Sequence, residues 1–181
     1  MVKVVVPPAV EPVLPAELKT YLRYGQTTTQ QDSMMEMLLT AGREEAEKYQ
    51  NAAYCEQTLQ IALDAPTSGA IVLPRPPFKS LESVIYYDTN DIQTDITDLF
   101  AVNDIAWPVE IKLRDGQTWP NATPRNQNPI VITYKSGSTD VPNKVKLAIL
   151  FYASWFFMHP DAEKIPEAFY SLLKKGRVIP V

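Results

Sequence analysis

The sequence predicts an α+β fold, in which a small bundle of about four helices carries an inserted antiparallel β-sheet or hairpin region. Two observations support this prediction. Helical patterns lie on either side of a middle region, residues 57–134, in which short runs alternate polar and apolar side chains between prolines and glycines. A long apolar segment, residues 141–159, then has the pattern of a central helix. We therefore expect the strands to be inserted between two pairs of helices.

Length and composition restrict the class of protein. A chain of 181 residues can form one domain, or one domain with an arm, and bury roughly 70% of its unfolded surface. The formal net charge is −4 and no basic run is longer than Lys174-Lys175, which argues against tight binding of nucleic acid. Sixteen prolines against six glycines favour fixed loops and extended arms. The single cysteine, Cys55, excludes an internal disulfide and indicates a reducing compartment.

An extended arm and a short helix are expected at the start of the chain. Residues 1–13 form the predicted N-terminal arm, because valines alternate around Lys3 and three prolines then exclude a helix. The first helix is expected over residues 14–25, where Pro15 suits the first turn and Gly25 provides a stop.

The second helix is expected over residues 33–51. Ser33 and Glu36 have the spacing of a capping box, in which two side chains satisfy free N–H groups of the first turn. Small residues follow on the apolar side, Gly42 among them. We expect them to let another backbone approach this helix closely.

The middle of the chain is predicted to be β. Six strands are expected, at residues 59–63, 71–74, 81–88, 100–103, 109–114 and 130–134. The Asp115-Gly116 pair after the fifth strand is a strong signal for a hairpin turn. These short strands with turn signals favour an antiparallel sheet.

The segment 141–159 is the helix around which the predicted fold is organised. Asp140 can cap its start, Pro142 suits its first turn, and Ser154 is the only polar residue from Leu147 to Met158. At about 100° per residue, one side presents Leu147, Phe151, Trp155 and Met158, and the other presents Ile149, Tyr152 and Phe156. The apolar run is shorter than the ~17 residues that cross a bilayer, so no membrane contact is expected.

A helix that is apolar on both sides needs cover on both sides. In a chain of this size, one side can pack on its own domain while the other meets a neighbouring copy. We therefore expect an oligomer. The residues assigned to the core or to an inter-subunit contact are Leu147, Phe151, Tyr152, Trp155 and Phe156.

A last helix is expected over residues 165–175, with Gly176 as its stop. The tail, residues 176–181, is apolar and would either fray or plug a groove on another protein. The predicted organisation is therefore an arm at residues 1–13, a single domain at residues 14–175, and this tail.

Catalysis finds little support in the sequence. His159 is the only histidine, and its place at a helix end suits capping of the last carbonyls better than acid–base chemistry. The acidic segment at residues 88–98 departs from the calcium-binding EF-hand pattern at Gln93 and Leu99, so we expect a solvated loop. No phosphate-binding glycine loop, CxxC pair or Ser/His/Asp set is visible. We expect a protein that is not an enzyme and uses no metal or cofactor.

Seven segments of the chain together carry a resemblance to a known family. In chain order they are ELKTYLR, QDSMMEMLLTAGREEAEKYQNAAYCEQT, LPRPPFKSLESVIYYD, GQTWP, IVITYKSG, VPNKVKLAILFYASWFF and AFYSLLKKGRV. They cover most of the chain from Leu14 onward. The chain resembles the head-to-tail connector, or head completion adaptor, proteins of long-tailed bacteriophages.

The resemblance implies a structural protein of the virion neck, made in the cytoplasm of the host bacterium. Copies would form a homo-oligomeric ring, a dodecamer, under the portal protein of the capsid. The ring would extend the DNA channel and carry the next neck, stopper or tail-terminator protein. Double-stranded DNA would pass without specific binding, since a slightly acidic lumen repels phosphates.

The resemblance also implies a docking segment, because the C-terminal segment of related adaptors docks into the portal. In this chain it corresponds to Phe169, Lys174, Lys175, Arg177, Val178 and Ile179. Their basic side chains would face acidic portal surface. Two alternatives stay open: a DNA-binding or packaging accessory protein, and a tail-completion protein on the other side of the joint.

Overall fold

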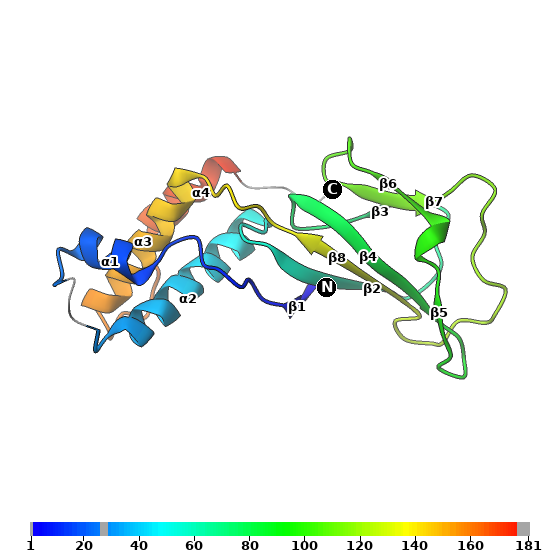
Figure 1. Ribbon diagram of the computed structural model, residues 1–181, viewed down its shortest axis with the longest axis horizontal. Helices are drawn as coiled ribbons and strands as arrows, with labels where there is room; N and C mark the ends of the chain where they lie inside the picture. The colour runs from blue at the N-terminus through cyan, green and yellow to red at the C-terminus, as the bar shows by residue number, and fades with distance from the viewer. Residues whose placement is uncertain (1, 26–28, 177–181) are drawn as a thin grey trace. The chain divides into compact units, whose positions relative to one another are not determined.

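The computed structural model of the protein describes residues 2–25 and 29–176 (Figure 1). The chain folds into two compact units, each built from two stretches. The β unit comprises Met1–Pro7 and Glu56–Gly137, and the helical unit comprises Pro8–Cys55 and Ser138–Val181. The predicted α+β class, with antiparallel strands inserted between helix pairs, is confirmed. The division into an arm, a single domain and a tail stays a prediction. The presence of two compact units does not show which parts of the chain fold independently.

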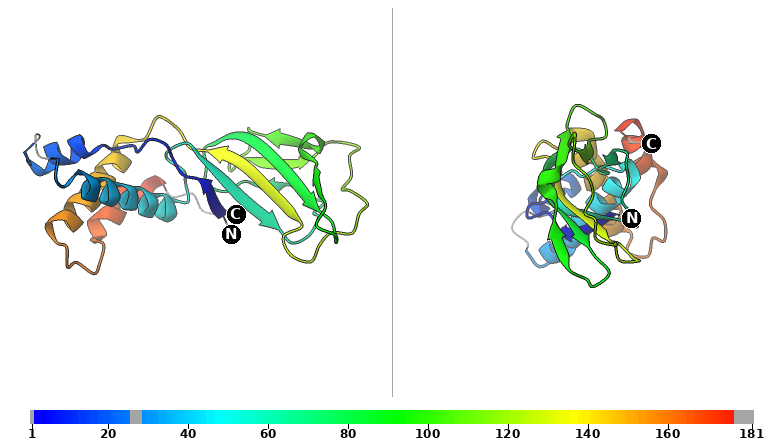
Figure 2. Two further views of the ribbon diagram at one scale, coloured as in Figure 1. Left: turned by 60° about the horizontal axis from the view of Figure 1, so that its bottom comes forward. Right: turned by 90° about the vertical axis from the view of Figure 1, so that its right-hand side faces the viewer.

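Two antiparallel sheets form the β unit (Figures 1 and 2). The larger sheet has the strand order β1 (Val2–Val6), β2 (Gln57–Leu63), β8 (Ile130–Ser136), β4 (Phe78–Tyr87) and β5 (Gln93–Asp95). The smaller sheet has the order β3 (Ile71–Val72), β7 (Glu110–Leu113) and β6 (Phe100–Asn103). A 3-10 turn, η1 (Thr97–Leu99), precedes β6.

The two sheets share one apolar core. Ile130, Ile132 and Tyr134 of β8 are all 0% exposed, because every second side chain of a strand points to the same face. Ile111 of β7 joins the same core from the smaller sheet. The Tyr134 hydroxyl donates a hydrogen bond to the carbonyl oxygen of Pro74 at 2.7 Å. The proline-rich LPRPP segment is thereby held against β8.

Strand pairing differs from the sequence prediction in two respects. All six expected strands are present, but the structure adds β1 within the predicted extended arm and β5 within the segment that was expected to be a loop. The hairpin predicted at Asp115-Gly116 is wrong. The turn itself forms, with the N–H of Gln117 donating to the carbonyl oxygen of Arg114 at 2.9 Å. However, β7 pairs with β3 and β6, whereas the next strand, β8, belongs to the larger sheet.

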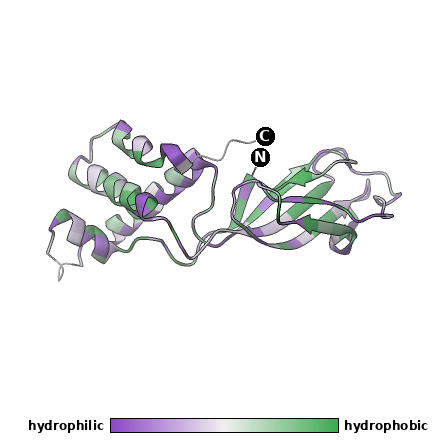
Figure 3. Cartoon of the chain, turned by 90° about the horizontal axis from the view of Figure 1, so that it is seen from above, coloured by the Kyte–Doolittle hydropathy of each residue, from purple (hydrophilic) through white to green (hydrophobic). Residues whose placement is uncertain are grey.

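The helical unit contains α1 (Pro15–Leu22), α2 (Asp32–Gln50), α3 (Asn143–Met158) and α4 (Glu167–Leu173), followed by a 3-10 turn, η2 (Lys174–Gly176). The helix α3 contacts each of the other three. Figure 3 shows hydrophobic residues on the strands of the β unit and on the helices of the helical unit. Each unit therefore has its own apolar core.

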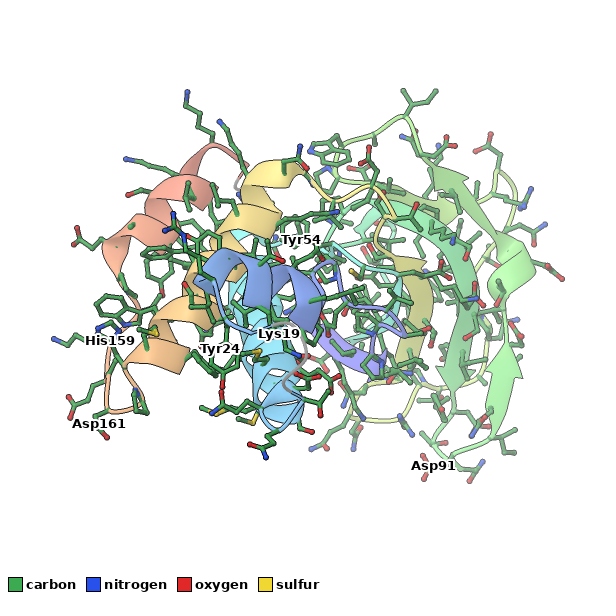
Figure 4. All side chains as sticks on the ribbon, turned by 60° about the vertical axis from the view of Figure 1, so that its left-hand side comes forward. Lys19, Tyr24, Tyr54, Asp91, His159 and Asp161 are labelled. Atoms are coloured by element: carbon green, nitrogen blue, oxygen red, sulfur yellow. The ribbon has the colours of Figure 1, made fainter. Side chains whose placement is uncertain are left out.

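The start of α2 differs from the predicted capping box. The helix begins after Gln31, which makes no side-chain cap, so the box assigned to Ser33 and Glu36 is wrong. The first residue of the helix, Asp32, instead places a carboxylate oxygen 2.6 Å from Nζ of Lys19 on α1 (Figure 4). An ion pair with a neighbouring helix thus holds the first turn of α2.

The predictions for the two ends of α3 had different outcomes. The helix begins after Pro142, whose side chain has no capping oxygen, so the predicted Asp140 cap is wrong. At the other end, Nδ1 of His159 lies 3.1 Å from the carbonyl oxygen of Trp155 (Figure 4). The predicted capping role of His159 is confirmed.

Close packing between α2 and α3 depends on Gly42. A Cβ atom at this position would lie 3.1 Å from Cδ1 of Tyr152, which is tighter than ordinary van der Waals contact. The missing side chain therefore makes room for an aromatic ring of α3. The sequence predicted a close approach at Gly42, but the approaching group is a side chain and not a backbone.

A buried ionic cluster ties the segment before α1 to α2. Arg43, only 3% exposed, donates from Nε to Glu11 at 2.8 Å and from Nη1 to Glu47 at 2.9 Å. The carboxylate of Glu47 also accepts a hydrogen bond from the backbone N–H of Tyr54 at 2.8 Å. These partners satisfy a charge that burial alone would make costly.

We expect Arg43→Ala to lower the free energy of unfolding by about 3–5 kcal/mol, because the buried carboxylate of Glu47 loses its ionic partner. Lys48→Ala is a matched control on the same helix. The Lys48 side chain is 77% exposed, and a surface ion pair such as its pair with Glu45 contributes only ~0–1 kcal/mol. Urea denaturation followed by circular dichroism measures both variants. Equal losses would contradict the assigned role of Arg43.

Candidate assembly surface

One side of α3 lies in the core of the helical unit. Its most buried residues are Val145, Ala148, Ile149 and Ala153, each between 0% and 4% exposed. Tyr152 and Phe156 lie on this side, with ring centroids 4.8 Å apart, and Tyr152 also contacts Phe169 of α4 at 5.5 Å. Of the residues that the sequence assigned to this side, Ile149 and Tyr152 therefore pack in the core of the helical unit, and Phe156 is half-buried beside Tyr152.

The opposite side of α3 is only partly covered in the single chain, where Phe151 packs against the core of the helical unit. Leu147 is 41% exposed and Met158 is 64% exposed, and the half-buried rings of Phe151 and Trp155 lie between them. The Trp155 ring stacks on His159 with a centroid distance of 4.2 Å. We refer to Leu147, Phe151, Trp155 and Met158 as the α3 stripe. An apolar stripe of this kind typically marks an interaction surface.

The structure separates the predicted docking residues. Phe169 is 0% exposed and belongs to the core, because α4 turns it inward together with Leu173. Its ring is therefore a packing residue, and its assignment to docking is wrong for the folded chain. Lys174 and Lys175 are exposed in η2. The other three predicted residues, Arg177, Val178 and Ile179, lie outside the described part of the chain.

A second exposed apolar group, which the sequence analysis missed, lies between β6 and β7. Ile105 is 93% exposed and Trp107 is 67% exposed. The hairpin holds them on a short loop, because Asn103 pairs with Glu110 at its base and Val109 is only 5% exposed. We call Ile105 and Trp107 the β6–β7 tip. No periodicity marks such a loop; the signal was two large apolar side chains between predicted strands.

Nucleophilic chemistry is not supported by the environment of Cys55. The thiol is free and buried, and burial raises its pKa to about 11. A thiol with such a pKa is almost entirely protonated at neutral pH and reacts poorly.

The acidic segment between β4 and β6 uses its carboxylates to fix turns. Asp88 accepts hydrogen bonds from the backbone N–H groups of Asn90 and Ile92, at 2.8 and 2.9 Å. Hydrogen bonds from Thr97 lower the pKa of Asp95. Within residues 2–25 and 29–176, no three metal-ligating side chains come together. No helix in the same ranges has the length and apolar character needed to cross a membrane.

Comparison with known proteins shows the fold. No protein-family model and no curated protein matches this sequence. Among solved structures, a chain of the "Neck of empty GTA particle computed with C6 symmetry" matches with a TM-score of 0.79 and 18% identity. A chain of the "Virion of native gene transfer agent (GTA) particle" matches with a TM-score of 0.77 and 20% identity.

A third chain, from the "Neck of native GTA particle computed with C12 symmetry", matches with a TM-score of 0.75 and 21% identity. In all three comparisons the match covers 100% of this chain and 97% of the other. Both the β unit and the helical unit therefore have counterparts in these neck and virion chains. At this identity the likeness establishes a shared fold.

Truncating a side chain to alanine should destabilise the protein more on the buried side of α3 than on the exposed side. We expect Ile149→Ala to lower the free energy of unfolding by about 2–5 kcal/mol, because it leaves a cavity in the core. Leu147→Ala on the same helix should cost less than about 1 kcal/mol, since its 41% exposed side chain fills no enclosed space. Urea denaturation of the two variants measures the difference. A larger loss for Leu147→Ala would show that the stripe is covered within the chain.

Proposed function

We propose that this protein is a structural component of the neck of a phage-like particle. Its copies form an adaptor ring that docks under the portal protein, extends the DNA channel and carries the next neck or tail protein. The observation that carries this proposal is the full-length likeness to chains of neck and virion structures, two of them from necks computed with C6 or C12 symmetry. The proposed role involves no catalysis and no cofactor.

The open side of α3 supports assembly of several copies. A closed ring is built from heterologous contacts, in which each copy offers two different surfaces to its neighbours. The α3 stripe supplies an apolar surface of the kind that such contacts bury. A ring of twelve copies is the proposed state, in agreement with the C12 symmetry of one neck structure.

Charge supports a channel through which DNA slides. The formal net charge is −4, so the ring as a whole would not neutralise phosphates and release counterions. Basic side chains are instead exposed at the end of the described chain, where Lys174 and Lys175 precede Arg177. We assign these three residues, with Val178 and Ile179, to portal docking.

Assembly tests the proposed function. The purified chain is mixed with the portal protein of the same particle, and the products are analysed by native mass spectrometry and cryo-electron microscopy. We expect a ring of twelve copies seated against the portal. A chain that stays monomeric and never joins the portal would refute the proposal.

A DNA gel shift at physiological salt separates the adaptor from a DNA-binding accessory protein. We expect no complex below about 1 μM protein, because non-specific binding requires many neutralised phosphates. Tight, sequence-tolerant binding would instead favour the accessory protein.

Portal docking by the C-terminal segment has its own test. Deleting residues 176–181 should leave the free energy of unfolding unchanged and abolish portal binding. Lys174→Glu with Lys175→Glu should weaken binding by about tenfold or more at low salt, because rim charges govern electrostatic attraction. The matched control reverses Lys48 and Lys164, which are also exposed. Unchanged portal binding by the deletion variant would exclude the assignment.

A further inference from the structure

Two apolar surfaces are exposed in the single chain. Each is a candidate to bury the other at a contact between two copies. The α3 stripe includes Leu147 at 41% and Met158 at 64% exposure, and the β6–β7 tip has Ile105 at 93% and Trp107 at 67%. Isolated exposed apolar residues are common on protein surfaces, but clustered ones indicate interfaces. Of these residues only Phe151 of the stripe packs against the core of its own unit.

The charges around the two surfaces are opposite. The tip lies in a stretch, residues 80–111, that contains no lysine or arginine, and the exposed Asp104 directly precedes Ile105. The stripe lies in a stretch, residues 141–160, that contains no aspartate or glutamate. Its first turn carries the exposed Lys144, which is three residues before Leu147 and so on the same side of α3.

Asp104 and Lys144 are also without ionic partners among the residues that the structure describes. The first turn of α3 has no acidic residue of its own and no side-chain cap. A carboxylate brought to this end would be favoured both by Lys144 and by the positive end of the helix dipole.

We propose that in the ring the β6–β7 tip of one copy packs on the α3 stripe of the next copy, with Asp104 facing Lys144. This inference rests on the proposed function, because it needs a ring of identical copies. The contact joins two different surfaces and therefore propagates from copy to copy until the ring closes. A contact of one stripe with another would instead form an isologous pair, which stops at two copies.

The occupant of the stripe is a second copy and not the portal, for two reasons. The stripe of every copy in the ring needs to be buried, and every copy provides one tip that can bury the stripe of its neighbour. The tip also matches the stripe in charge, because Asp104 directly precedes Ile105 and Lys144 lies one turn before Leu147.

Disulfide trapping tests the contact directly. With Cys55→Ala as background, the chain has no other cysteine. Chains carrying Ile105→Cys are mixed with chains carrying Leu147→Cys, assembled with the portal and oxidised. We expect a covalent pair on a non-reducing gel, and a ladder of higher oligomers when both cysteines are in one chain.

The matched control replaces Ile105→Cys with Ile92→Cys, because Ile92 is 60% exposed on a different turn of the β unit. This control should give no ladder. Rings that form but give no link between positions 105 and 147 would overturn the inference and leave the proposed function standing. Links only between two copies of Leu147→Cys would overturn it in favour of stripe-to-stripe contact. Failure of the unmodified chain to form any ring would overturn the proposed function itself.

Charge reversal gives a second and independent readout. Asp104→Lys and Lys144→Asp should each raise the concentration needed for assembly by about tenfold, since each places like charges face to face. The double variant should assemble at nearly the concentration of the unmodified chain. Reversal of Asp98 and Lys48, which are exposed elsewhere, should have no effect. A double variant as defective as the single variants would overturn the pairing of Asp104 with Lys144.

Discussion

The structure of the helical unit depends on one constraint, which is that α3 is apolar on both sides. Only one side of α3 is packed into the core of its own chain. Gly42 of α2 leaves room for the Tyr152 ring, and Phe169 of α4 covers the same ring from the C-terminal part of the chain. The stripe on the other side keeps Leu147 and Met158 exposed. Among the described residues, this side is left partly uncovered, which is the basis of the proposed contact between copies.

Buried polar contacts tie α2 to α1 and to the segment before α1. Arg43 joins Glu11 and Glu47 in the interior, and Lys19 of α1 joins Asp32 at the start of α2. Such contacts contribute little net stability, because desolvation offsets most of the attraction. Their effect is geometric, since a displaced helix would leave a buried charge unpaired. The contacts therefore hold α2, on which α3 packs, in place within the helical unit.

Periodic features were predictable from the sequence, and features set by distant partners were not. The 3.6-residue period placed Ile149 on the buried side of α3 and Leu147 and Met158 on its exposed side, although Phe151 packs against the core, and alternation located six of the strands. The Asp115-Gly116 hairpin failed because a turn does not specify which sheet the next strand joins. Phe169 was assigned to docking from the resemblance alone, whereas α4 turns its side chain into the core. The tip at Ile105 and Trp107 was missed because exposure in a loop has no period.

The strength of the proposed contact between copies follows from its composition. A tip of two large side chains against a four-residue stripe is small beside a standard protein interface, so one contact alone should be weak. In a closed ring each copy would make the contact twice, and the proposed docking on the portal would gather the copies at high local concentration. Weak single contacts would therefore keep free chains dispersed, whereas the same contacts repeated around the ring would hold it together. Charge reversal at Asp104 is a sensitive probe for this reason, because the repulsion is repeated at every junction of the ring.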